Sequence, residues 1–230
     1  MSISETTSPG AGEPPRSTYP PPPRGEAHWP PQLVVAVAIA LQLLLPQRLS
    51  AGPRWLIPAL EILLLVTLLI ASPFRIERRH PTRRRLAVAV TGLASVANAI
   101  SLALLCHYLF QHNVTQGHAL IIAGVLIWLT NVLIFSLWYW EMDRGGPGTR
   151  AGALDGPPDM LFPQMATVEL CPGWRPQFAD YLYVSLTNAT AVSPTDTMPL
   201  SVQAKLLMGL QSLVSLITIG LIISRAVNIL

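Results

Sequence analysis

DYLYVSLTNATAVSPTDTMP, residues 180–199, is the stretch that decides the fold. Its first part, residues 180–192, is only half apolar and carries hydroxyl groups at Ser185, Thr187 and Thr190. A helix needs roughly 20 mostly apolar residues to cross a bilayer, so this part is too short and too polar to span one. It nevertheless lies between two apolar runs of spanning length, Ala119–Trp140 and the segment that begins near Val202. This order predicts a re-entrant loop, a kind of backbone tolerated at membrane depth only where protein or water surrounds it.

The composition predicts an all-α, polytopic membrane protein. Hydrophobic residues make up 51% of the 230 residues and charged residues only 12%, whereas soluble domains average about 25% charged residues. The net charge of +3 is small, and the basic residues gather beside the apolar runs, which favours a topology signal over a nucleic-acid patch. Cys106 and Cys171 show neither a disulfide framework nor metal-ligand spacing, so we expect no metal and no other cofactor.

The chain divides into four parts by composition. Residues 1–30 are rich in proline and poor in large apolar side chains, which predicts a disordered tail. Residues 31–140 hold four apolar runs, at 33–45, 55–74, 86–110 and 119–140. The first of these is short and is either a thin spanning helix or an interfacial one. A Gly- and Pro-rich loop at 141–179 leads to the re-entrant loop and final helix at 180–230, for about five transmembrane helices in all.

Two features of the four-helix region concern orientation and burial. Glu61 lies inside the second apolar run, where burying an acid in lipid costs free energy, so such a residue usually faces a bundle interior or water. The alternative is that Glu61 lies near the membrane interface. Six arginines separate the second and third runs, namely Arg75, Arg78, Arg79, Arg83, Arg84 and Arg85. Because such clusters remain on the cytoplasmic side, we expect the fourth run to end inside and the re-entrant loop to enter from the cytoplasm.

The final apolar run carries a stripe of residues at helical spacing, Gln211, Ser215, Thr218 and Ile222. Such a stripe lines water or packs against a neighbouring helix, and small polar residues often serve packing. Acidic residues after the fourth run, Glu141 and Asp143, have no accompanying nucleophile or metal-ligand set. We therefore expect no enzyme activity.

From Ala119 onward the chain offers an outer-helix candidate, a short semi-polar helix with Thr187 and Thr190, then Asp196, Pro199 and an inner-helix candidate. This order resembles the two-helix pore module of tetrameric potassium channels, and it covers residues 119–230. The family's filter reads Thr-Val-Gly-Tyr-Gly-Asp, and in its place stand Ala191, Val192, Ser193, Pro194, Thr195 and Asp196. The filter needs glycines for its backbone conformation, and Pro194 restricts its own φ and the residue before it. The architecture transfers by this resemblance, and potassium selectivity does not.

The resemblance implies an ion-channel-like protein that works as a tetramer, because one module has too few helices to enclose a pathway. Thr187 and Thr190 would end the pore helix, residues 191–195 would line a degenerate filter, and Asp196 would favour monovalent cations with weak selectivity. The stripe from Gln211 to Ile222 would line the inner helix. The alternative is a non-conducting structural or partner-binding protein derived from the same fold. The general plan also resembles multi-pass bacterial membrane proteins, and both readings place the chain in the cell membrane without a nucleic-acid partner.

Overall fold

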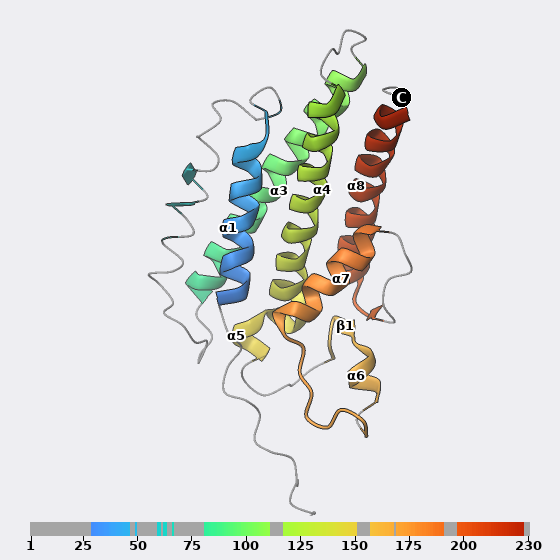
Figure 1. Cartoon of the computed structure of the whole chain (residues 1–230). Coiled ribbons are helices and arrows are strands. Elements are labelled where there is room, and N and C mark those ends of the chain that lie inside the picture. Colours follow the sequence, from blue (N-terminus) through green and yellow to red (C-terminus); the bar gives the residue numbers. More distant parts are fainter. Residues whose placement is uncertain are drawn as a thin grey trace, which may run out of the picture.

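The computed structural model describes residues 29–46, 49, 59–60, 62–63, 66, 81–110, 117–150, 157–167, 169–190 and 197–227. In this part the chain is mostly helical, as predicted (Figure 1), with five longer helices: α1 (Trp29–Leu44), α3 (Pro81–Phe110), α4 (Gly117–Met142), α7 (Phe178–Thr190) and α8 (Val202–Val227). Short elements connect them, namely η2 (Asp143–Gly145), α5 (Pro147–Arg150), β1 (Met160–Leu161), α6 (Pro163–Ala166) and β2 (Met198–Pro199). The two-residue strands β1 and β2 pair with each other and were not predicted.

Three of the described helices are long and apolar enough to cross a membrane: Thr82–Leu109, His118–Gly145 and Val202–Val227. The first run forms α1, an apolar helix of 16 residues that is shorter than a span. Most of the second run, 55–74, lies outside the described residues, and Glu61 lies there too. The expected total of about five spans therefore stays a prediction.

Helix α4 is the centre of the bundle and contacts α1, α3, α7 and α8. Its sequence explains this position, because it is apolar on every side, and a helix of that kind is stable only when it is surrounded. At Gly124, which faces α8, an added Cβ would lie 2.6 Å from Cγ1 of Ile222. The absence of a side chain at Gly124 thus lets the two long helices come together, as small residues do in membrane bundles.

The middle of helix α8 buries polar side chains and exposes large apolar ones. Its buried face is Ala204, Met208, Gln211, Ser215 and Thr218. Its exposed face carries large apolar side chains, Leu206, Leu210, Leu213, Leu216, Ile217, Ile223 and Val227. A helix in water would bury the second set and expose the first. The reversed pattern is the one that a hydrocarbon surrounding favours.

Candidate functional site

Helix α7 lies between α4 and α8 and runs antiparallel to α4 (Figure 1). Near its start, the hydroxyl of Tyr181 donates a hydrogen bond of 2.6 Å to Oδ2 of Asp143, just beyond the end of α4. One turn later, the hydroxyl of Ser185 donates a hydrogen bond of 2.6 Å to the carbonyl of Val132. At 1.5 Å per residue, this second contact lies roughly 15 Å deeper along α4. Helix α7 therefore reaches about halfway into the bundle.

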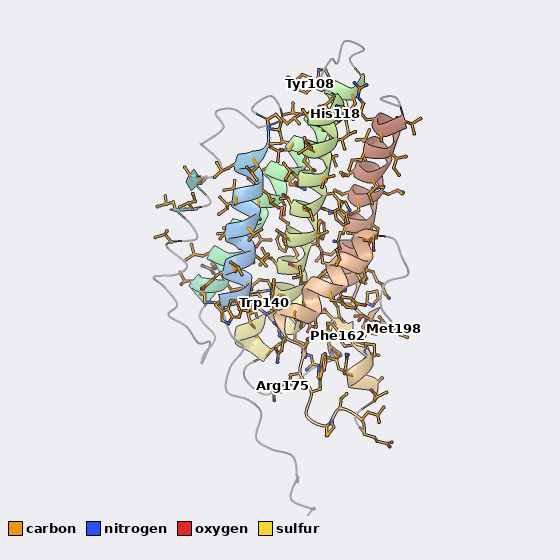
Figure 2. All side chains as sticks on the ribbon, in the orientation of Figure 1. Tyr108, His118, Trp140, Phe162, Arg175 and Met198 are labelled. Carbon is orange, nitrogen blue, oxygen red and sulfur yellow. The ribbon has the colours of Figure 1, made fainter. Side chains whose placement is uncertain are left out.

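The chain enters α7 and returns from it at the same end of the bundle. Before α7, Phe162 stacks edge-on against Tyr181 with ring centroids 5.4 Å apart. After α7, Pro199 of β2 is the register partner of Met160 in β1, which lies two residues before Phe162. Figure 2 shows Trp140, Phe162, Arg175 and Met198 at one end of the molecule, and Tyr108 and His118 at the opposite end. A helix that crossed the bundle would instead have its two flanks at opposite ends.

The inner half of α7 is joined to both neighbouring helices by buried hydrogen bonds among four side chains, Tyr139, Ser185, Asn188 and Gln211, which we call the polar junction. The carboxamide of Gln211 donates from Nε2 to the carbonyl oxygen of Ser185 at 2.9 Å and to its hydroxyl at 2.7 Å. Its Oε1 accepts hydrogen bonds from the Tyr139 hydroxyl and from Nδ2 of Asn188, the latter at 2.9 Å. Tyr139, Ser185 and Gln211 are fully buried. Gln211 thus links all three helices.

Three further hydrogen bonds extend the polar junction. Nδ2 of Asn188 also donates to the carbonyl of Met208 in α8 at 3.0 Å, and its Oδ1 accepts a hydrogen bond of 3.1 Å from Ser212. One turn further along α8, Ser215 accepts a hydrogen bond of 2.9 Å from Nδ2 of Asn131 in α4. Because hydrogen bonds have directions and apolar contacts do not, this set fixes the depth and rotation of α7 between its neighbours.

A second cluster of polar groups anchors the start of α7 at the end of α4. The carboxylate of Asp143, which is completely buried, accepts hydrogen bonds from the Tyr181 hydroxyl and from the backbone N–H of Asp159 at 2.9 Å. Nη1 of Arg150 donates to the carbonyls of Trp140 and Asp143, each at 2.7 Å. Its guanidinium group also lies 5.2 Å from the centre of the Tyr181 ring. This anchor joins Asp143, Arg150 and Asp159 to the start of α7.

The first turn of α7 is capped by its own acid. The backbone N–H of Gln177 donates a hydrogen bond of 2.7 Å to Oδ2 of Asp180, which satisfies one amide at a helix start. Burial raises the pKa of the Asp180 carboxyl, and the hydrogen bond from Gln177 lowers it by a smaller amount. A negative charge at this end of α7 also faces the positive end of the helix dipole.

Apart from the stripe on α8, the predicted site residues lie in the last turn of α7, in the first turns of α3, or outside the described residues. Thr187 and Thr190 lie in the last turn of α7, and their hydroxyls bond to carbonyls of α7 itself. The filter-like residues 191–196 lie outside the described residues, as do Arg75, Arg78 and Arg79. Arg83, Arg84 and Arg85 belong to the first turns of α3.

The predicted stripe on α8 points into the chain. Gln211, Ser215 and Thr218 are buried, with exposed fractions of 0%, 1% and 0%. Ile222 is half-buried and lies opposite Gly124. Within one chain, the buried part of the stripe packs against neighbouring helices, which is one of the two uses considered above.

The sequence reasoning missed the partners of Gln211. Neither Tyr139 nor Asn188 was predicted as a partner of Gln211, and Ser185 was noted only as a hydroxyl. One signal could have found them: Tyr181, Ser185 and Asn188 are four and three residues apart, which places them on one face of a helix. A polar face on a short helix next to a polar stripe on a long one indicates that the two faces meet.

Comparison with protein-family models, curated proteins and solved structures finds no match to this chain. Within the described part of the chain, no three His, Cys, Asp or Glu side chains come close enough to hold a metal ion. The geometry of α7 and its two flanks is therefore the basis for any statement about function.

Proposed function

We propose that this chain is a multi-pass protein of the cell membrane, and that residues 119–230 form a pore-type module for monovalent cations with weak selectivity. The observation that carries the proposal is the short helix α7, which enters beside the end of α4 and whose last turn contacts α8 at Gln211, the tenth of its 26 residues. At 13 residues it is about 20 Å long, whereas a bilayer core is about 30 Å thick. In a membrane, α7 and the segment after it form a re-entrant loop.

A helix that ends inside a membrane leaves its last carbonyl groups without partners in the helix. Such groups are stable at that depth only next to protein or water. They also carry the negative end of the helix dipole, which favours a nearby cation. The C-terminal end of α7 at Thr190 is therefore a fitting place for a cation path, with residues 191–196 beside it and Asp196 at its mouth.

A pathway of this kind needs several copies of the chain, because α4, α7 and α8 alone do not surround a central space. The exposed apolar side chains of α8 leave a face that lipid or another copy can cover. We expect a tetramer, by the resemblance of residues 119–230 to potassium-channel modules.

A second candidate function is a non-conducting structural or partner-binding role. The observation that favours it is the burial of Gln211, Ser215 and Thr218, which removes these polar groups from the outer face of α8. If copies met around that face, the path beyond the re-entrant loop would be lined mainly by leucine and isoleucine. Chemical cross-linking in native membranes separates the candidates, because a monomer would exclude the pore.

The test of the first candidate is ion flux from proteoliposomes that contain the purified full chain, under separate potassium, sodium and chloride gradients. We expect cation flux in the wild type and a weaker cation preference in Asp196→Asn. Glu169→Gln is the matched control, because Glu169 is an exposed acid in the loop before α7. Reversal potentials that are unchanged in Asp196→Asn would contradict the pore model. Absence of flux under every gradient would favour the second candidate.

A further inference from the structure

A pocket of about 870 Å³ opens at the end of the bundle where α3 begins and α4 ends. Its size is within the range of small-molecule sites, roughly 300–1,000 Å³. Its polar lining comes from three directions: the arginines of α3, the turn that follows α4, and the first turn of α8. The residues concerned are Arg83, Arg84, Arg85, Glu141, Gly145, Gly146 and Gln203.

The polar part of the pocket is positively charged, since three arginines face one carboxylate. Arg84 and Arg85 are exposed, so their guanidinium groups can reach a ligand. Arg83 is half-buried and lies over the ring of Trp140 at 5.9 Å, which fixes its position. The carboxylate of Glu141 is only 3% exposed and lies beneath the turn, 3.2 Å from where a Cβ on Gly146 would stand. The positive charge is therefore at the mouth and the negative charge at the floor.

The glycines of the turn keep this floor open. Gly145 and Gly146 have φ angles of 74° and 96°, which side-chain-bearing residues rarely adopt. A Cβ at Gly146 would come 3.0 Å from the carbonyl of Glu141, and 3.7 Å from Nε of Arg84. The turn thus brings bare backbone close to the arginines, an arrangement that leaves room for a group with several acceptor oxygens.

Apart from Pro147, Gly148 and Thr149 in α5, the rest of the lining is apolar and belongs to the spanning helices. It consists of Val88 in α3, Trp138 and Met142 in α4, and Leu206 and Leu207 in α8. Val88 is one turn beyond the arginines, and Leu206 one turn beyond Gln203. The pocket therefore changes from cationic to apolar in the direction of the bundle centre, and a ligand that fits it has an anionic head and an apolar tail.

We propose that this pocket binds a phosphate group, supplied by the bilayer as the headgroup of an anionic lipid, with the start of an acyl chain along α3 and α8. Arginines recognise phosphate oxygens through planar, paired N–H donors. Basic pockets between membrane helices on the cytoplasmic side suit such headgroups. This inference rests on membrane insertion and is independent of ion conduction.

The test uses the full chain purified in detergent. Binding is measured from thermal stability over a titration of three probes: a phosphatidylglycerol, a phosphatidylcholine with the same acyl chains, and inorganic phosphate. We expect stabilisation by phosphatidylglycerol well beyond that by phosphatidylcholine. The double variant Arg84→Gln/Arg85→Gln should weaken the apparent phosphatidylglycerol affinity by roughly 25-fold, since each basic residue contributes about a fivefold factor.

Two further variants make the result specific. Arg84→Lys/Arg85→Lys keeps both charges but loses the paired donors, and should retain only part of the preference for phosphatidylglycerol. Arg175→Gln removes a positive charge at the same end of the bundle but outside the pocket, and should leave binding unchanged. Equal stabilisation by the two lipids, or an equal loss in Arg175→Gln, would overturn the proposal. Inorganic phosphate that stabilises as strongly as phosphatidylglycerol would overturn the lipid source and assign the pocket to a soluble phosphate.

Discussion

Replacing Gln211 by leucine should destabilise the bundle more than any other conservative change in α8. The substitution retains the side-chain volume but removes four hydrogen bonds: two that Nε2 donates to Ser185, and two that Oε1 accepts from Tyr139 and Asn188. Hydrogen bonds between membrane helices contribute about 0.6 kcal/mol each on average. We therefore expect a loss of about 2–3 kcal/mol in the free energy of unfolding.

The loss has an identifiable origin. Oε1 of Gln211 is the acceptor that the structure gives to the Tyr139 hydroxyl, which is fully buried. Asn188 keeps its bond to the Met208 carbonyl, so it loses less. Leaving a buried donor without an acceptor costs about 1–3 kcal/mol. Tyr139→Phe in the Gln211→Leu background should then recover part of the stability, because it removes that donor.

The assay is reversible unfolding in mixed micelles of increasing denaturing-detergent content, followed by tryptophan fluorescence. Gln203→Leu is the matched control, since Gln203 is an exposed residue two turns earlier on the same helix. We expect Gln203→Leu to stay within about 0.5 kcal/mol of wild type. If Gln211→Leu changed stability no more than Gln203→Leu, the polar junction would not hold α7 in place and the reasoning would fail.

Two other substitutions test the anchor at the end of α4 in the same unfolding assay. Tyr181→Phe removes the hydroxyl that donates to the buried Asp143 carboxylate and should lower the free energy of unfolding by about 1–3 kcal/mol. Tyr183→Phe is the control and should be nearly neutral, because Tyr183 is 57% exposed. Equal effects of the two substitutions would argue against the anchor. Gly146→Ala should destabilise by about 1–3 kcal/mol, because φ is 96° and the new Cβ would lie 3.0 Å from the Glu141 carbonyl. Gly220→Ala, where nothing lies within 4 Å of the new Cβ, should be neutral or stabilising. If the Gly146→Ala protein were as stable as the Gly220→Ala protein, the argument from backbone strain at Gly146 would fail.

The helices of the bundle could be predicted because each long apolar run has the length of a spanning helix and a clear end. The run predicted at 119–140 corresponds to α4, and the stretch 180–192 corresponds to α7 within two residues at each end. Helix α3 begins at Pro81, five residues before the predicted run, because arginines extend a helix readily even though they are not apolar.

The polar junction could not be predicted in full, since it depends on how far α7 slides along α4 and α8. Sequence spacing showed that Gln211, Ser215 and Thr218 share a face, but it did not show which helix that face meets. The pairing of Met160 with Pro199 was also beyond reach, because each strand has two residues and no alternating pattern. The pocket at Arg83–Arg85 requires the turn at Gly146 and the start of α8, which only the fold brings together.

Sidedness of thiol labelling tests the central claim, that α7 enters and returns at one face of the membrane. In a Cys106→Ser/Cys171→Ser background, single cysteines would be placed at Arg175, Met198 and His118 and exposed to a membrane-impermeant thiol reagent in sealed, oriented vesicles. The account predicts that Arg175→Cys and Met198→Cys react from the same face, and that His118→Cys reacts from the other (Figure 2). Reaction of Arg175→Cys and Met198→Cys from opposite faces would mean that α7 crosses the membrane, which contradicts the account.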